Sequence, residues 1–141
     1  MLKMAESMNY EVYKEYEAVL LKIKALKKIV RIGDFYGDVE KVIISPEERC
    51  CVMAGCGIII YFLHEPFIPY EYGKVCEQWK EWYRSENIWI RNVVMEKESV
   101  IEIEMENGEK TKIQIGLDLK KKLNECSALS SRNLKGLSEN R

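Results

Sequence analysis

The sequence predicts an α+β fold: a single domain in which a mostly antiparallel β-sheet packs against an N-terminal amphipathic helix. Three features of the 141 residues point to it. Apolar residues between positions 10 and 31 recur every three or four residues, the spacing of one helix face. Residues 50–63 carry no charge and contain two glycines. Residues 99–115 alternate apolar and polar side chains around an Asn-Gly pair, as hairpin strands do.

We expect the helix to cover about residues 10–31. Asn9 is a favourable N-cap residue, and Gly33 is typical of the position just after a helix end. The same spacing could form a coiled-coil seam, but the stripe is broad, rich in tyrosine and only three heptads long, which favours packing on a sheet. The apolar stripe consists of Val12, Tyr16, Val19, Ile23, Leu26 and Val30.

The middle of the chain predicts strands at about residues 39–45, 49–54 and 57–63. The uncharged run at 50–63 is too short for a membrane helix, which needs about 20 apolar residues. Glycines at 55 and 57 divide it into two short runs that are apolar on both faces, as interior strands are. We therefore expect a hairpin at the centre of the sheet, with these glycines at its turn or at a close backbone approach.

Residues 64–73 predict an ordered loop, because prolines at 66 and 69 cannot donate hydrogen bonds to a sheet. Phe67, Tyr70 and Tyr72 give this loop unusually large aromatic content. Two interpretations stay open at this stage: the rings fold onto the core, or they present a contact patch.

Strands are also expected at about residues 75–83 and 87–95. A helix is the alternative for 75–83, since Cys76, Trp79, Trp82 and Tyr83 would then cluster on one face. The strand is favoured because aromatic residues prefer strands.

The last hairpin, with strands at about 99–105 and 109–115, can be predicted to its register. A three-residue loop at 106–108 places Ile101 opposite Ile113 and Glu102 opposite Lys112, so one face is apolar and the other carries opposite charges. Gly108 then takes the left-handed position of the loop. We expect the globular domain to end near residue 116, with a short helix and a mobile polar tail in 117–141.

Charge is unevenly distributed along the chain, although the net charge is only −1. Residues 34–116 contain nine Lys and Arg against sixteen Asp and Glu. Nucleic acid is therefore not expected as a direct partner, because phosphate binding needs a cationic face, whereas a basic protein suits this segment. Without an export signal or a membrane span, the protein is expected in the cytoplasm, with no membrane partner.

Residues that could support catalysis or metal binding are few. The five cysteines form no CxxC pair and fit neither a disulfide framework nor a zinc site. His64 is the one histidine, and no glycine-rich phosphate loop is present. Glu102, Glu104 and Glu106 alternate along a strand, as solvated charges do. We expect no enzymatic activity, catalytic residue, cofactor or metal.

A series of motifs between residues 45 and 89 resembles immunity proteins of bacterial polymorphic toxin and contact-dependent growth inhibition systems. The relatives share a Ser-Pro-Asp-Gly-Arg turn, a glycine-bearing step, Glu-Pro-Phe, Tyr-x-Tyr and Gln-Trp. This sequence has Glu47-Glu48 where the turn usually has Asp-Gly. The matching residues are Ser45, Pro46, Gly55, Gly57, Ile58, Tyr61, Glu65, Pro66, Phe67, Tyr70, Tyr72, Gln78, Trp79, Ile88 and Trp89.

The resemblance implies a small protein, monomeric alone, that forms a heterodimer with a cognate toxin domain, for which a nuclease would be a suitable target. Acidic and aromatic residues are the candidates for this contact, since they combine electrostatic steering with anchoring rings. The alternative function is a small non-enzymatic module that binds a ligand or assembles as a homo-oligomer. The candidate partner-binding residues are Glu65, Tyr70, Glu71, Tyr72, Glu81, Trp82, Tyr83, Glu102 and Glu104.

Overall fold

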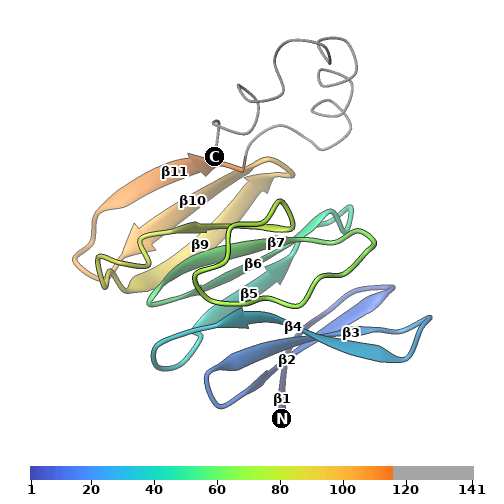
Figure 1. The fold of residues 1–141 in the computed structure, drawn as a ribbon. Helices are drawn as coiled ribbons and strands as arrows, with labels where there is room; N and C mark the ends of the chain where they lie inside the picture. Colours follow the sequence, from blue (N-terminus) through green and yellow to red (C-terminus); the bar gives the residue numbers. More distant parts are fainter. Residues whose placement is uncertain (116–141) are drawn as a thin grey trace, which may run out of the picture.

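The computed structural model describes residues 1–115, which form three antiparallel sheets (Figure 1). Within these residues every regular element is a strand. The first sheet has the order β1 (Leu2–Glu6), β2 (Tyr10–Glu15), β3 (Ala18–Ile23), β4 (Lys28–Asp34). The second has the order β5 (Lys41–Ile44), β6 (Cys50–Gly55), β7 (Gly57–Phe62), β8 (Trp79–Trp82). The third has the order β11 (Lys110–Gln114), β10 (Val100–Met105), β9 (Ile90–Lys97).

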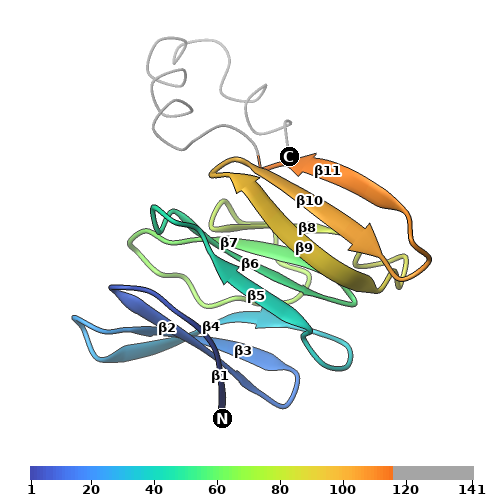
Figure 2. The ribbon, with the colours of Figure 1, turned by 180° about the vertical axis from the view of Figure 1, so that it is seen from behind.

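The second sheet lies between the other two, so the molecule has three layers (Figures 1 and 2). Every residue of β6 and β7 is buried. Because successive side chains of a strand point to opposite faces, one set, including Met53 and Ile59, packs against the first sheet. The other set, including Val52 and Ile60, packs against the third sheet. Burial on both faces explains why residues 50–63 carry no charge.

The predicted helix at 10–31 is wrong, and with it the α+β class: the described chain is all-β. The residues of the expected helical stripe have two different environments. Val12, Val19, Ile23 and Val30 face the core from β2, β3 and β4, whereas Tyr16 and Leu26 are exposed in the turns between these strands. The buried valines and isoleucine of three short strands and the exposed residues of the turns between them happen to follow one another every three or four positions. This spacing is the same as that of one helix face.

Both predicted hairpins are confirmed. The central one is formed by β6 and β7, with Gly55 opposite Gly57. In the last hairpin Ile101 pairs with Ile113, and Gly108 has a φ of +95° as the three-residue loop requires. Within 75–83, the segment Trp79–Trp82 is a strand, and the predicted strands at 39–45 and 87–95 correspond to β5 and β9. The helix and tail predicted for 117–141 lie outside the described residues.

The loop between β7 and β8 is attached to the core by two side chains. The Tyr61 hydroxyl donates a hydrogen bond to the Ile68 carbonyl oxygen at 2.7 Å. The buried Gln78 amide donates to the carbonyl oxygens of Phe62 at 2.7 Å and His64 at 3.0 Å. Both interpretations of the loop aromatics apply in part. Phe67 and Tyr70 are buried, whereas the Tyr72 side chain remains exposed.

Glu48, in the turn between β5 and β6, joins this turn to the one between β1 and β2. Its carboxylate accepts hydrogen bonds from the Ser7 hydroxyl, the Asn9 backbone amide (2.9 Å) and the Asn9 side chain (2.6 Å). Glu48 has a φ of +58°, the conformation for which glycine is the usual residue. In the immunity-protein turn that this segment resembles, Ser-Pro-Asp-Gly-Arg, the corresponding position is a glycine. The hydrogen bonds of Glu48 connect the first two sheets.

The Gly-Cys-Gly tip of the β6–β7 hairpin is approached closely by two other segments. A Cβ atom on Gly55 would lie 2.8 Å from the backbone oxygen of Asp38. A Cβ atom on Gly57, whose φ is +93°, would lie 2.7 Å from Arg84 Cδ and 3.0 Å from the Tyr83 carbonyl oxygen. The absence of side chains therefore lets the β4–β5 connection and the segment after β8 pack directly on the hairpin tip.

We expect Gly57→Ala to destabilise the protein more than Gly108→Ala. Both glycines have positive φ, but a Cβ on Gly108 would have no atom within 4 Å. Gly108→Ala should cost about 1 kcal/mol from backbone strain alone. Gly57→Ala should cost about 2–4 kcal/mol, because steric overlap is added. Urea unfolding of both variants measures the difference, and equal losses would contradict this account of the hairpin tip.

Replacement of Glu48 by Gln should lower the free energy of unfolding by about 1 kcal/mol at neutral pH. Partial burial opposes the charged carboxylate, but the hydrogen bonds from Ser7 and Asn9 outweigh it and hold the pKa of Glu48 below its usual 4.5. The stabilisation from ionised Glu48 is therefore complete above pH 4.5 and is lost as the pH falls through the lowered pKa.

Urea midpoints measured from pH 7 down to pH 3 should therefore show the Glu48→Gln variant converging on the unsubstituted protein. Glu47→Gln is the matched control, since Glu47 is exposed and its carboxylate forms a surface ion pair with Arg49. A constant difference across the pH range would show that the Glu48 charge contributes nothing.

Candidate functional site

The β2–β3 turn meets the β4–β5 connection at one end of the molecule (left in Figure 1), and each carries an exposed tyrosine, Tyr16 and Tyr36. A third exposed tyrosine, Tyr72 of the β7–β8 loop, lines the same hollow as Tyr36. The exposed fractions of Tyr16, Tyr36 and Tyr72 are 89%, 76% and 67%. The Phe35 amide donates to the Glu17 carbonyl oxygen at 2.9 Å, and the Gly37 amide donates to Glu17 Oε2 at 2.8 Å. We name this surface the tyrosine end; it comprises Tyr16, Tyr36 and Tyr72 with the exposed carboxylates of Glu15, Glu17, Asp38 and Glu71.

Local backbone geometry explains why two of these rings face solvent. Tyr16 is the first residue of a two-residue turn and has a φ of +57°, which is uncommon for a tyrosine. In the β4–β5 connection, Phe35 is buried and anchors the chain, so the adjacent Tyr36 projects outward. Gly37 has a φ of +79°, and a Cβ atom there would lie 2.8 Å from the Trp89 ring. A residue with a side chain at position 37 would displace this connection.

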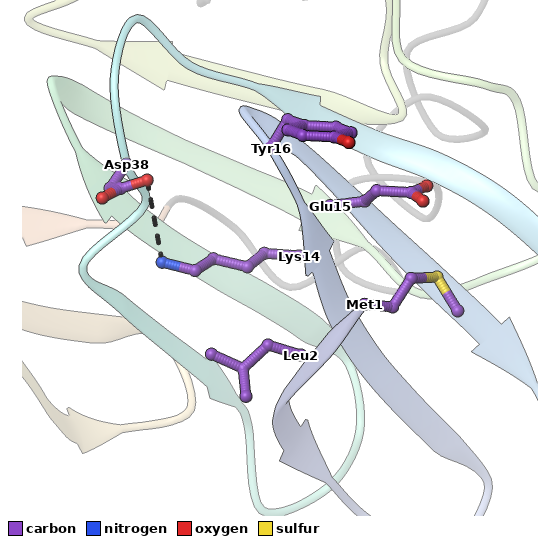
Figure 3. A pocket seen from close by; sticks show the side chains of 6 residues that line it. All are labelled: Met1, Leu2, Lys14, Glu15, Tyr16 and Asp38. Carbon is purple, nitrogen blue, oxygen red and sulfur yellow. Dashed lines mark ion pairs between the residues drawn. The ribbon is translucent and has the colours of Figure 1, made fainter.

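The first of two hollows at this end has a volume of about 460 Å³ and lies beside the β2–β3 turn (Figure 3). Lys14 Nζ lies 3.8 Å from Asp38 Oδ1, so the lysine side chain reaches from β2 to the β4–β5 connection (Figure 3). The Asp38 side chain is largely exposed and the separation is long, so this pair contributes little to stability. The hollow is lined by Met1, Leu2, Lys14, Glu15, Tyr16 and Asp38.

The second hollow is smaller, about 290 Å³, and Arg84 forms one of its walls. Arg84 Nη2 donates to the Asp34 carbonyl oxygen at 2.6 Å, and Nε lies 3.3 Å from Glu81 Oε1. The guanidinium carbon lies 4.6 Å from the centre of the Phe35 ring, a cation–π contact. These contacts fix the arginine in place. The hollow is lined by Asp34, Phe35, Tyr36, Cys56, Tyr72, Arg84 and Asn87.

A buried tyrosine, Tyr70, is connected to this arginine through Glu81. The Tyr70 hydroxyl donates to Glu81 Oε1 at 2.9 Å, and its ring lies 5.0 Å from that of Trp79. Burial, and then the hydrogen bond to Glu81, raises the pKa of Tyr70 well above its usual value, so the hydroxyl stays protonated and remains a donor. Tyr70, Glu81 and Arg84 therefore form a connected network that holds the wall of the hollow rigid.

The residues that the sequence suggested for partner binding lie in different places. Glu71 and Tyr72 belong to the tyrosine end, and Tyr70 and Glu81 lie behind the wall of the smaller hollow. Glu65 lies apart from them, in a hollow near the β3–β4 turn lined by Leu26, Lys28, Glu65, Pro66 and Phe67.

The other four suggested residues lie on the third sheet or against it. Trp82 and Tyr83 are half-buried and pack on the core between the second and third sheets. Glu102 and Glu104 alternate with the inward-facing Ile101 and Ile103, so they lie on the solvent face of β10, where Glu104 pairs with Arg91. The structure therefore does not gather all nine residues into one surface.

Sequence reasoning missed Tyr16, Tyr36, Asp34 and Arg84. Tyr16 was placed in the helical stripe, although its position between two glutamates fits an exposed turn as well. Tyr36, followed by Gly37 and Asp38, stands in a sequence typical of a turn, and this signal could have marked an exposed ring. Asp34 and Arg84 come together only in the folded chain, and no local pattern indicates their proximity.

No protein-family model matches the sequence, and comparisons with curated proteins and with solved structures find no match either. The resemblance to immunity proteins therefore stays a prediction. In the part of the chain that the structure describes, no group of three or more His, Cys, Asp or Glu side chains lies close enough together to bind a metal ion. Residues 1–115 also contain no helix that is long and apolar enough to cross a membrane.

We expect Tyr70→Phe to lower the free energy of unfolding by about 1–3 kcal/mol, because the partly buried Glu81 carboxylate loses a hydrogen bond. Tyr13→Phe is a matched control, since the Tyr13 hydroxyl also donates to a glutamate, Glu11, but on the solvent face of the first sheet. That change should cost clearly less, because the Tyr13 hydroxyl is accessible to water in the folded protein. Urea unfolding tests both, and equal effects would show that the buried network adds no stability.

Proposed function

We propose that the protein is an immunity protein that neutralises a cognate bacterial toxin by binding it through the tyrosine end. The observation that carries the proposal is the gathering of three exposed tyrosines and several exposed carboxylates around two hollows at one end of the molecule. Large aromatic side chains are rarely left exposed together without a role in contact. Tyrosine is also enriched among the residues that dominate protein–protein binding energies.

The two kinds of side chain have complementary effects in such a contact. Tyrosine rings bury a large area while losing little conformational entropy, since they have only two side-chain torsions. Carboxylates attract a basic partner over distance and accelerate its association. A toxin that cleaves nucleic acid needs a cationic surface for its own substrate, so this combination suits it.

The charge around the tyrosine end remains negative after internal pairing. Lys14 approaches Asp38 and Arg84 pairs with Glu81, so the two cations are accompanied by carboxylates. Glu15 and Glu71 are exposed as well. In this proposal the protein acts in the cytoplasm by occupying the toxin, as a monomer that becomes a heterodimer, and performs no reaction itself.

The proposal is tested with the C-terminal toxin domain encoded by the gene directly upstream. The two purified proteins should form a 1:1 complex in light scattering and in titration calorimetry. A gene without such a neighbour, or no association at micromolar concentration, would contradict the proposal. A homodimer without toxin affinity would instead support an assembly module.

Substitutions at the tyrosine end should weaken this complex. Tyr36→Ser and Tyr72→Ser should each reduce affinity, at least one of them by about 30-fold, as expected for an anchoring residue. Tyr16→Asn removes the third ring while keeping a residue that tolerates positive φ. Leu26→Asn is the control, because Leu26 is 53% exposed but lies in the β3–β4 turn, at the opposite end of β3 from Tyr16. Unchanged affinity in all three tyrosine variants would exclude this surface.

A further inference from the structure

We infer that the smaller hollow receives one arginine side chain of the partner protein, whose guanidinium pairs with the Asp34 carboxylate between the rings of Tyr36 and Tyr72. This inference rests on the proposed function and names the chemistry of the central contact. It follows from the volume of the hollow, from the tyrosine rings that line it, and from the interactions that its charged residues make within the protein.

The size of the hollow suits a single side chain. Its volume of about 290 Å³ is just below the range of about 300–1,000 Å³ typical of pockets for small organic ligands. Tyr36 and Tyr72 both line it and are largely exposed in the free protein. The guanidinium carbon of Arg84 lies 5.9 Å from the centre of the Tyr72 ring, so an incoming group has access to the Tyr36 ring and to the part of the Tyr72 ring that Arg84 leaves exposed. A planar guanidinium packs favourably on the face of an aromatic ring.

Asp34 is the acidic residue that lines the hollow. Its backbone carbonyl oxygen accepts from Arg84, but within residues 1–115 its side chain makes no hydrogen bond or ion pair. Asp34 is partly buried, so its carboxylate is only partly hydrated. Two carboxylate oxygens can accept two parallel N–H bonds from one guanidinium, a geometry that an ammonium group cannot match.

Arg84 does not fill this role from within the protein. Its Nε lies beside Glu81 and its Nη2 donates to a backbone oxygen. Its guanidinium carbon lies 4.6 Å from the centre of the Phe35 ring and 5.9 Å from that of the Tyr72 ring. Glu81 balances the charge of Arg84, so an incoming cation meets the net negative charge of Asp34. Arg84 Nη1 is buried and forms no hydrogen bond with any described residue. A hydrogen-bond acceptor of the toxin, such as a carboxylate, is therefore the alternative occupant of the hollow.

The first test uses the toxin domain and stopped-flow kinetics. Asp34→Asn keeps the shape of the side chain and removes its charge, and it should weaken binding by about 30-fold or more, mainly through faster dissociation. Glu71→Gln, at the exposed rim, should instead slow association at low salt. Glu47→Gln, at the opposite end of β5, should change neither rate.

An arginine-to-lysine scan of the toxin domain identifies the occupant. One replacement should reproduce the loss seen with Asp34→Asn, and combining the two should add little further loss, as expected for directly interacting residues. If the toxin binds but neither Asp34→Asn nor any arginine replacement weakens it, the inference is overturned and the proposed function stands.

The second test needs no toxin, so it separates failure of the inference from failure of the proposed function. Amide NMR signals of Gly37 and Asn87 are followed during titration of the full chain with N-acetyl-arginine amide. They should shift with this probe, shift less with the lysine analogue, and not respond in the Asp34→Asn variant. The corresponding glutamate derivative is titrated in the same way. No shift with the arginine probe, or larger shifts with the glutamate derivative, including at the Arg84 signals, would overturn the inference.

Discussion

Burial of the β6–β7 hairpin on both faces is the constraint on which the rest of the structure depends. Its side chains are apolar on each side, so one covering layer would leave half of them in water. The first sheet covers the face that includes Met53 and Ile59, and the third sheet covers the face that includes Val52 and Ile60. Both outer sheets need only one apolar face, which is why β3 and β10 alternate buried and partly exposed residues.

The same hairpin positions the candidate site. Gly55 allows the backbone at Asp38 to approach, and Gly57 allows Tyr83 and Arg84 to do so. The β4–β5 connection and the segment after β8 therefore meet at the hairpin tip, and they supply most of the lining of the smaller hollow. The site is thus attached to the most buried part of the molecule, although its tyrosines are exposed.

Features set by local sequence were predictable, and features set by distant contacts were not. The last hairpin was predicted to its register because the alternation and the turn glycine at Gly108 lie within a few residues of each other. The N-terminal segment was mistaken for a helix because the exposed turn residues Tyr16 and Leu26 happened to continue the helical spacing of the buried valines. The apolar residues Val19, Leu21 and Ile23 at every second position were the competing signal, and these are the buried residues of β3, although the apolar Leu20 between them weakened the alternation.

The candidate site was only partly foreseen for the same reason. Tyr72 and Glu71 were found because they stand in an aromatic, acidic loop, but the pairing of Asp34 with Arg84 joins residues 50 positions apart. Several residues that carry the resemblance to immunity proteins, among them Ser45, Gln78 and Trp79, are buried. Ser45 Oγ accepts from the Arg49 and Cys50 amides, so its contribution is to the fold.

The uncharged segment at the molecular centre has a second consequence. It combines β-branched residues with no charge and no proline, the composition of segments that stack into cross-β fibrils. In the native chain β5 and β8 occupy the two edges of this hairpin, and the outer sheets seal its faces. The outer layers therefore protect the protein against self-templated fibril growth, independently of any contribution to partner recognition.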